Sequence, residues 1–474
     1  MNKYDYNIIV VGAGSAGLVS SYIAAAVKAR VALIEGHRMG GDCLNTGCVP
    51  SKALIRSAKI LSYAKRAKEF GFKKAEITFD FQDVMQRVHR VIKAIEPHDS
   101  RERYTRLGVD CIEGTAKITS PHSVAVNGKT LRARAIVVAT GARPIVPPIP
   151  GLDTIDYLTS DNLWNLKELP KKLLVLGGGP IGSEMAQAFS RLGADISLVE
   201  MSPQILIRED EEVIKLVTEK FTKEGIKVLV NHKAKEFKGN TLICEHQGED
   251  VEIAFDKVII ALGRRANVTG FGLEELGVDI GKRGTIVANP FLQTNMPSIY
   301  VCGDVTGPYQ FTHTAAHQAW YASVNALFSP FKKFKVDYSV IPWATFTDPE
   351  VARVGLNEKD AKAANIPYEV TTYGIDDLDR AIADSEAHGF VKVLTVPGKD
   401  KILGVTILGT HAGDLIAEYI LAMKHGIGLN KILGTIHIYP TLAEANKYAA
   451  GAWKRAHVPA FAMKILEKFH AWRR

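Results

Sequence analysis

Two cysteines separated by four residues carry the clearest chemical signal in the chain. They are Cys43 and Cys48, in the stretch GGDCLNTGCVPSKAL. Because Pro50 fits the first turn of a helix, we expect a helix to begin near Cys48 and to place Cys48 and Lys52 on one face. A thiolate at a helix N-terminus beside an ammonium group is stabilised. The pattern therefore favours a nucleophilic or redox-active thiol over the alternative, a pair of inert buried cysteines.

The residues before this pair have the pattern of a dinucleotide-binding strand-helix-strand unit. We expect a strand over 6–11, the turn GAGSAG, a helix, and a second strand that ends at Glu35. Gly12 would make the tight turn, Gly14 would let the backbone approach a pyrophosphate, and Gly17 would allow close packing of helix on strand. The Glu35 carboxylate would then accept hydrogen bonds from an adenosine ribose.

The same plan recurs in KLLVLGGGPIGSEMAQAFSRLGADISLVE. The corresponding glycines are Gly177, Gly179 and Gly182. Glu200 follows the first of them by 23 positions, the same spacing as from Gly12 to Glu35. A second element also repeats, because IVVATGAR (136–143) and VIIALGRR (258–265) are both apolar strands that run into glycine and arginine. The equal spacing and the repeated strand together argue against two unrelated glycine turns. They predict two dinucleotide-binding sites.

Glu200 bears on which nicotinamide cofactor fills the second site. A carboxylate there favours a free 2′-hydroxyl and repels a 2′-phosphate, so we expect NADH. Arg208 could compensate if its loop folds back, which keeps NADPH as the alternative. From about residue 340 the glycine turns stop, and segments such as GFVKVLTV predict an antiparallel sheet with flanking helices.

The size and charge of the chain set outer limits on its function. Its 474 residues suggest about three domains. The net charge of +8 is spread over a large surface and does not identify a nucleic-acid binder. The apolar opening stops at glycines after Val11, so we expect no signal peptide, and the five scattered cysteines form neither a secreted disulfide framework nor a zinc site. We expect a cytoplasmic protein.

Taken together, these motifs resemble the class I flavoprotein disulfide oxidoreductases, the family of dihydrolipoyl dehydrogenase, glutathione reductase and mercuric reductase. The most specific match is the C-x4-C-x-P-S-K segment, formed here by Cys43, Cys48, Pro50, Ser51 and Lys52. The resemblance covers essentially the whole chain and implies an α/β fold with two Rossmann-like domains, one for FAD and one for NAD, plus a C-terminal α+β dimerisation domain. The implied ranges are 1–150 and 269–340 for FAD, 151–268 for NAD(P), and 341–474 for dimerisation.

The resemblance also implies the cofactor contacts. For FAD these are Gly12, Gly14, Gly17, Glu35, Lys52, Ala116, Thr140, Gly141, Asp304, Phe311, Thr312, His313 and Ala315, and for NAD they are Gly177, Gly179, Gly182, Glu200 and Gly263. Lys52 would lie near flavin N5 and pair with Glu184. Cys48 would face the flavin, and Cys43 would face the substrate. Asp42 departs from the family, whose members usually carry threonine there.

A second departure lies in HIYPTLAE, near the C-terminus. Disulfide-reducing relatives have the segment H-P-T-x-x-E, in which the partner subunit's histidine is the general acid and base. Here Tyr439 takes that position, Glu444 is in register, and His437 lies two residues early. A phenol titrates near ~10 and imidazole near ~6.5, so we expect weak turnover of disulfides. If the segment is extended, His437 is the second candidate proton carrier, because residues two apart share a side.

Mercuric reductases also lack that histidine, which makes a metal-ion acceptor plausible. Against it, the last cysteine is Cys302, so the C-terminal cysteine pair of full mercuric reductases is missing. We therefore expect a homodimeric enzyme whose acceptor is a small-molecule or protein-bound disulfide or a metal ion, with no resident metal. Two alternatives stay open: reduction of quinones or oxygen directly from the flavin, and a redox sensor without turnover. The basic tail after residue 452 is expected to be a surface helix on the dimer, in preference to a membrane contact.

Overall fold

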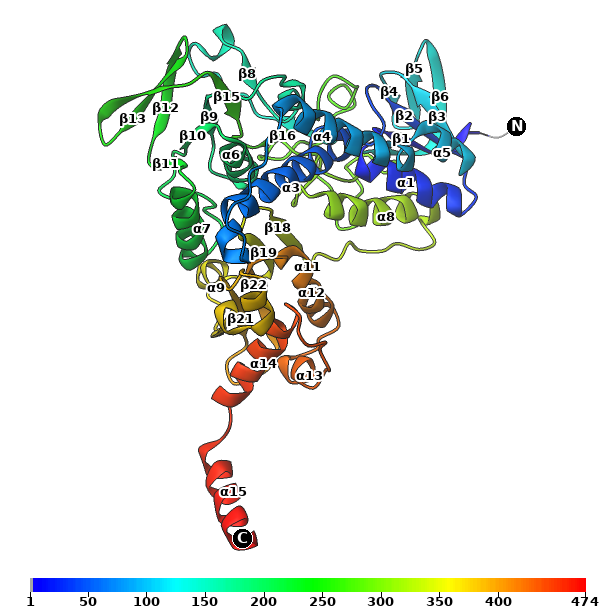
Figure 1. Cartoon of the computed structure of the whole chain (residues 1–474). Helices are drawn as coiled ribbons and strands as arrows, with labels where there is room; N and C mark the ends of the chain where they lie inside the picture. The colour runs from blue at the N-terminus through cyan, green and yellow to red at the C-terminus, as the bar shows by residue number, and fades with distance from the viewer. Residues whose placement is uncertain (1–2) are drawn as a thin grey trace.

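The computed structural model describes residues 3–474, which form three lobes and a projecting C-terminal helix (Figure 1). The first lobe is built on a seven-stranded sheet whose order is β3-β2-β1-β6-β5-β4, with β17 paired to β6. The strands are β1 (Tyr6–Val11), β2 (Val31–Glu35), β3 (Val109–Glu113), β4 (Lys117–Ser120), β5 (Ser123–Val126), β6 (Lys129–Val138) and β17 (Ile299–Val301). Strands β1, β2, β3, β6 and β17 are parallel, and their apolar runs are buried on both faces.

The helices of this lobe include the two that carry the cysteine pair. The helices are α1 (Ser15–Ala26), α2 (Gly41–Asn45), α3 (Cys48–Lys65), α4 (Phe81–Ile95), α5 (Arg101–Arg106) and α8 (Thr312–Phe328). α1 packs along α8, as Figure 1 shows, although almost three hundred residues separate them. β17 and α8 thus return the chain to the first lobe after the second lobe is complete. The expected helix start near Cys48 and the strand that ends at Glu35 are confirmed.

The second lobe has a parallel sheet in the order β11-β10-β9-β15-β8. Its strands are β8 (Tyr157–Leu158), β9 (Lys172–Leu176), β10 (Asp195–Val199), β11 (Lys227–Leu229) and β15 (Lys257–Ile260), and its helices are α6 (Pro180–Leu192) and α7 (Glu211–Lys223). A three-stranded antiparallel sheet follows, made of β12 (Lys233–Lys238), β13 (Thr241–His246) and β14 (Glu249–Ala254). A two-stranded ribbon, β7 (Ala142–Pro144) with β16 (Arg264–Ala266), joins the connections between the first two lobes.

The third lobe is an antiparallel sheet in the order β18-β19-β22-β21-β20, as the alternating segments predict. The strands are β18 (Pro342–Thr345), β19 (Glu350–Gly355), β20 (Glu369–Gly374), β21 (Phe390–Thr395) and β22 (Ile402–Gly409). The helices are α9 (Glu358–Ala363), α10 (Asp379–Ala383), α11 (Ala412–Leu415), α12 (Ala417–Lys424), α13 (Leu429–Leu433) and α14 (Glu444–Ala456). The expected fold class is confirmed by two parallel nucleotide-type sheets and this α+β lobe.

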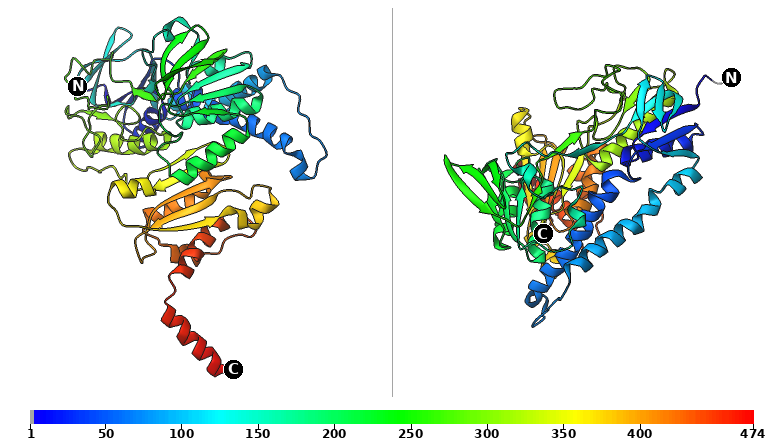
Figure 2. Two further views of the ribbon diagram at one scale, coloured as in Figure 1. Left: turned by 90° about the vertical axis from the view of Figure 1, so that its left-hand side faces the viewer. Right: turned by 90° about the horizontal axis from the view of Figure 1, so that it is seen from above.

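The last helix, α15 (Ala460–Arg473), stands apart from the three lobes (Figure 2). None of its residues is buried. Over residues 3–474, no helix combines the length and the apolar character that crossing a bilayer requires.

Candidate functional site

The two thiols of the predicted pair lie at the junction of α2 and α3. Cys43 is in α2, and Cys48 is the first residue of α3. Both are free thiols, and Cys48 Sγ lies 3.3 Å from Thr312 Oγ1 at the start of α8. The hydrogen bond from Cys43, together with Thr312 and the Lys52 charge, lowers the pKa of Cys48 to about 6, against the opposing effect of burial. The same hydrogen bond and burial raise the pKa of Cys43. Near neutral pH, Cys48 therefore holds the negative charge and Cys43 the proton.

Lys52 forms the expected ion pair with Glu184. Lys52 Nζ lies 2.9 Å from Glu184 Oε2 and stacks over the Phe346 ring, 4.3 Å from its centroid. The other oxygen of the buried Glu184 accepts a hydrogen bond of 2.9 Å from the Phe346 backbone N–H. Glu184 of the second lobe and Phe346, which follows β18 in the third lobe, thus fix the Lys52 ammonium group. It lies within one helical turn of the Cys48 thiol.

The first glycine turn has the geometry that an adenine dinucleotide requires. Gly12 has φ of 99°, and a Cβ atom there would lie 2.5 Å from the Ala139 carbonyl oxygen. A Cβ on Gly17 would lie 1.7 Å from the Gly12 oxygen, so α1 must pack on β1 through glycine. α1 starts after Gly14 without a side-chain cap, which leaves its N-terminal N–H groups for a phosphate. Glu35 accepts hydrogen bonds from the Ala13 and His37 backbone N–H groups, at 2.6 and 2.7 Å. These features fit FAD.

Other residues expected around FAD come from three further segments of the chain. Thr140 and Gly141 follow β6, and the Thr140 hydroxyl donates to the Asn267 carbonyl at 2.7 Å. The N-terminal part of α8 and the residue before it supply Phe311, Thr312, His313 and Ala315. Phe311 stacks on both His313 and Trp343. Ala116 is buried just before β4.

Arg264 was not predicted from the sequence to be a site residue. It supplies the positive charge that balances Asp42. Its guanidinium pairs with Asp42, lies 3.7 Å from Asp304 Oδ2, and donates to the Ala142 carbonyl at 2.7 Å. Burial, and less strongly Asp42, raises the pKa of Asp304, whereas Arg264 lowers it. One cation therefore balances two carboxylates beside the dithiol. The only signal in the sequence was its place in the repeated VIIALGRR strand.

The second glycine turn reproduces the first. Glu200 accepts hydrogen bonds of 2.7 Å from the Gly178 and Ser202 backbone N–H groups. α6 begins after Gly179 without a side-chain cap, and a Cβ there would meet nothing within 4 Å. The other turn glycines are Gly177 with φ of 112°, Gly182, and Gly263 after β15. The Arg208 carbonyl is bound by Arg353 and Asn357 of the third lobe. The site fits a nicotinamide dinucleotide.

The C-terminal segment differs from the arrangement that its spacing suggests. Residues 435–440 form no strand, and the side chains of His437 and Tyr439 have different partners. The His437 side chain is 6% exposed, and its Nε2 lies 3.0 Å from Glu418. Tyr439 is 66% exposed, and its hydroxyl donates to Asp379 at 3.0 Å. This hydrogen bond raises the pKa of Tyr439.

The hydrogen bonds of Glu444 also go to residues other than Tyr439. It accepts hydrogen bonds from the Thr441 backbone N–H at 3.2 Å and from the Tyr448 hydroxyl at 3.3 Å. The apolar side chains of Ile436 and Ile438, which flank His437, are strongly exposed. An exposed apolar strip beside the tyrosine is the surface expected of a contact between subunits.

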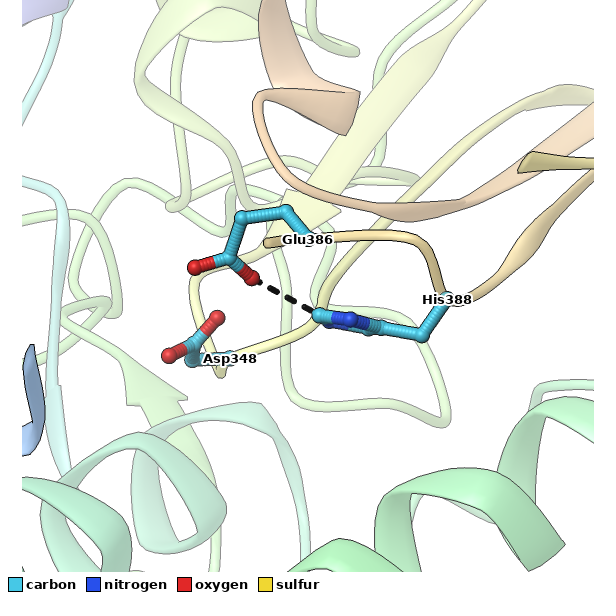
Figure 3. A group of neighbouring side chains, drawn as sticks. All are labelled: Asp348, Glu386 and His388. Atoms are coloured by element: carbon cyan, nitrogen blue, oxygen red, sulfur yellow. Dashed lines mark ion pairs between the residues drawn. The ribbon is translucent and has the colours of Figure 1, made fainter. Parts of the chain in front are cut away.

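Three further side chains have the types and spacing of metal ligands: Asp348, Glu386 and His388 (Figure 3). Arg191 pairs with Asp348 at 2.8 Å, and Lys59 lies 3.4 Å from it. Arg66 pairs with Glu386 at 3.1 Å. Although burial opposes it, the positive charges hold the pKa of Asp348 at about 2. The cluster is therefore an ion-pair network between the lobes, whose carboxylates are already compensated.

Two dinucleotide-binding lobes, a dithiol at a helix N-terminus and a third antiparallel lobe define a flavoprotein disulfide oxidoreductase. The chain belongs to the pyridine nucleotide-disulphide oxidoreductase family, whose model matches residues 6–319 and whose dimerisation-domain model matches residues 341–450. Members use FAD and NAD(P)H, and the dimerisation domain indicates a homodimer. The chain is an FAD-dependent oxidoreductase with Cys43 and Cys48 as its redox pair.

Its relatives fall into several branches of this family. It is 35% identical over 452 residues to dihydrolipoyl dehydrogenase of Chlamydia muridarum, covering 93% of this chain and 95% of the relative. It is 34% identical over 455 residues to mercuric reductase of Bacillus cereus, covering 94% and 71%. Among solved structures it is similar to a Cu(II) complex of the HOCl-induced flavoprotein disulfide reductase RclA of Escherichia coli, with a TM-score of 0.83, 27% identity, and coverage of 93% and 98%.

Proposed function

We propose that this enzyme uses NADH to reduce a thiophilic metal ion, with Cu(II) as the first candidate, through the Cys43 and Cys48 dithiol. The observation that carries the proposal is that, within residues 3–474, neither candidate proton carrier of the C-terminal segment is a free base. Tyr439 is bonded to Asp379 with a raised pKa, and His437 is turned onto Glu418. Similarity to RclA, whose structure contains Cu(II), supports the same choice.

The Cys43 thiol must lose its proton before it can react with an acceptor. In thiol-disulfide exchange, a base that titrates near neutral pH must take that proton, because the thiolate is the nucleophile. The pKa of Cys43 is raised, so it depends on such a base more than an ordinary thiol does. A coordinating metal ion instead deprotonates a thiol directly. A metal acceptor therefore needs no histidine before Pro440.

The overall step balances without other reactants. Two Cu(II) ions each take one electron from the reduced pair, which becomes the Cys43 to Cys48 disulfide and releases the single proton that Cys43 carried, and two Cu(I) ions leave. Bound FAD would supply the electron pair that restores the dithiol from NADH. We assign contact with the metal to Cys43, the thiolate beside the flavin to Cys48, and the stabilising charge to the Lys52 and Glu184 pair.

The cofactor contacts and the subunit arrangement follow from the same model of the site. We assign FAD to the Gly12 turn and Glu35, and NADH to the Gly177 turn, because Glu200 disfavours a 2′-phosphate. Tyr439 of one subunit would complete the dithiol site of the other, and its hydroxyl would hold a metal or donate a hydrogen bond. The cytoplasm keeps thiols reduced and supplies NADH, so we place the enzyme there.

Steady-state turnover tests the proposal. The purified enzyme is assayed with NADH or NADPH against Cu(II), Hg(II), lipoamide, glutathione disulfide and a quinone, with Cu(I) measured by a specific chelator. We expect Cu(II) to be reduced with a higher kcat/KM than either disulfide, and NADH to be preferred. Cys43→Ser and Cys48→Ser should abolish Cu(II) reduction, and Cys111→Ala should not, because Cys111 lies in β3 away from the pair. Cu(II) reduction that survives Cys43→Ser would mean that electrons leave directly from the flavin.

Turnover of lipoamide that exceeds Cu(II) reduction would overturn the choice of acceptor and leave the dithiol chemistry intact. Loss of all activity with every acceptor, in a protein that binds FAD, would instead favour the redox-sensor alternative. The two failures are therefore distinguishable within one set of assays.

A further inference from the structure

α15 is an ordered helix that packs on no part of the three lobes. Figures 1 and 2 show it extending away from the third lobe, beyond α14. It is connected through His457–Pro459, while Trp453 in α14 is buried in the lobe. His457 pairs with Glu369 at 2.9 Å, so the start of the connection is fixed to the body of the protein. The helix itself is left with all its side chains accessible.

α15 carries a row of large apolar side chains with basic residues along its edge. Large apolar residues recur at helical spacing on one face, and they are Phe461, Ile465, Phe469 and Trp472, with Leu466 beside them. Their exposed fractions lie between 42% and 81%. Lys464 and Lys468 border this row along one edge, because each lies three or four residues from members of the row. An apolar face of this kind, open to water, is unfavourable unless something covers it.

The charge of the chain is concentrated at the same place. Residues 454–474 hold six lysines and arginines and one glutamate, a net charge of +5, whereas the whole chain carries +8. The other 453 residues are therefore close to neutral for their size. Arg473 and Arg474 close the helix beside Trp472. Apolar and aromatic residues flanked by cations are the composition of helices that lie in the interface of an anionic bilayer.

We propose that α15 binds the surface of a bilayer that contains anionic lipid. The apolar face would enter the boundary between headgroups and acyl chains, and the lysines and arginines would contact lipid phosphates. The 14-residue helix would lie in the interface, as expected of a helix too short to span. The proposal revises the expectation that the tail packs on the dimer, and it does not depend on the acceptor.

A second copy of the chain is the competing occupant, and two observations argue against it. The family's dimerisation model ends at residue 450, ten residues before α15 begins, so the shared subunit interface does not require this helix. The helix and its flanks also carry like charge, so two α15 helices brought together across a two-fold axis would repel. An anionic surface has the complementary charge.

Vesicle flotation with the full-length holoenzyme tests the proposal. Vesicles of phosphatidylglycerol mixed with phosphatidylcholine are compared with vesicles of phosphatidylcholine alone. We expect the protein to float with the anionic vesicles only. Because each basic residue contributes on the order of fivefold to partitioning, Lys464→Gln with Lys468→Gln should lower the bound-to-free ratio by roughly 25-fold. Raising the salt from 0.1 M to 1 M shortens the Debye length from about 10 Å to about 3 Å and should release the wild type.

A matched pair of double variants tests whether flotation depends on the apolar face of α15 or on any exposed apolar side chain. Phe461→Ser with Phe469→Ser should abolish flotation. Phe72→Ser with Phe331→Ser removes two other exposed phenylalanines, which lie outside α15, and should leave flotation unchanged. NADH oxidation and gel filtration of each variant verify that the enzyme is folded.

Three results would overturn the proposal. One is equal flotation with neutral vesicles, and another is no flotation at all by a folded wild-type enzyme. The third is slow hydrogen exchange over 460–473 in lipid-free dimer that Phe461→Ser with Phe469→Ser abolishes, because the helix would then be covered by the partner subunit.

Discussion

Arg264 forms an ion pair with Asp42, the residue immediately before Cys43, although 222 positions separate the two in the chain. The same guanidinium reaches Asp304, so one side chain links the thiol-bearing helix α2, the ribbon strand β16 and the loop after β17. Asp42 and Arg264 are thus a compensated pair in this chain.

The first prediction concerns this pair. Arg264→Gln leaves Asp42 and Asp304 uncompensated near the proposed FAD phosphates, so we expect about tenfold weaker FAD binding, or ~1.4 kcal/mol. Asp42→Thr combined with Arg264→Gln should recover part of the loss. Titration of the apoprotein with FAD measures both effects. Equal losses in the single and double variants would show that the two side chains are not coupled.

The second prediction concerns the charge on Cys48. Lys52 lowers the pKa of this thiol and Glu184 raises it, so Lys52→Met should move the pKa upward and Glu184→Gln should move it downward. The ultraviolet absorbance of the thiolate, followed against pH in the reduced enzyme, gives both values, with the wild type near pH 6. Cys43→Ser provides the reference in which only one thiol of the pair titrates. Shifts of the same sign in the two variants would contradict the electrostatic explanation.

The lowered pKa of Cys48 also predicts how the free energy of unfolding changes with pH. A thiol with a pKa of about 6 when folded and ~8.5 when unfolded contributes stability that is fully present above the unfolded value. This contribution is lost as the pH falls toward and through 6. Urea unfolding of the reduced protein between pH 9 and pH 5 should therefore show a decline that Cys48→Ser lacks.

The third prediction concerns the proton carrier. Tyr439→His places a group that titrates near ~6.5 at the position before Pro440, so lipoamide reduction should rise at least tenfold in kcat/KM, toward the lower end of general acid-base effects of ~10². Tyr439→Phe removes the hydroxyl without adding a base and should give no gain. A similar gain in both variants would mean that release from Asp379 matters more than proton transfer.

The fourth prediction concerns the junction between the second and third lobes. Lys392 in β21 is 2% exposed and pairs with Asp210, Glu212 and Glu358. Lys392→Met would leave the buried Asp210 carboxylate without a cation, so we expect a loss of about 3 kcal/mol in the free energy of unfolding. Lys401→Met is the matched control, because Lys401 is exposed and close in sequence. Urea denaturation compares the two, and a loss below ~1 kcal/mol for Lys392→Met would mean that Asp210 is neutralised by other means.

Much of the fold was predictable because its signals are local. Strand β1, the glycine turn and β2 fall where hydrophobic period and glycine spacing put them, ending at Glu35. α3 begins at Cys48 for the same reason, since Pro50 acts within the first turn of the helix. The pairing of Lys52 with Glu184 was reached only through family resemblance, because no local pattern joins residues 132 positions apart.

What the sequence by itself determined is therefore the cofactor class and the dithiol, both of which depend on short runs of residues. Tertiary structure decided the rest. It paired Arg264 with Asp42, turned His437 onto Glu418 and Tyr439 onto Asp379, and left α15 uncovered. The physical reason is that a side chain's partner depends on the path of the whole backbone, whereas a glycine turn or a helix start depends only on its immediate neighbours.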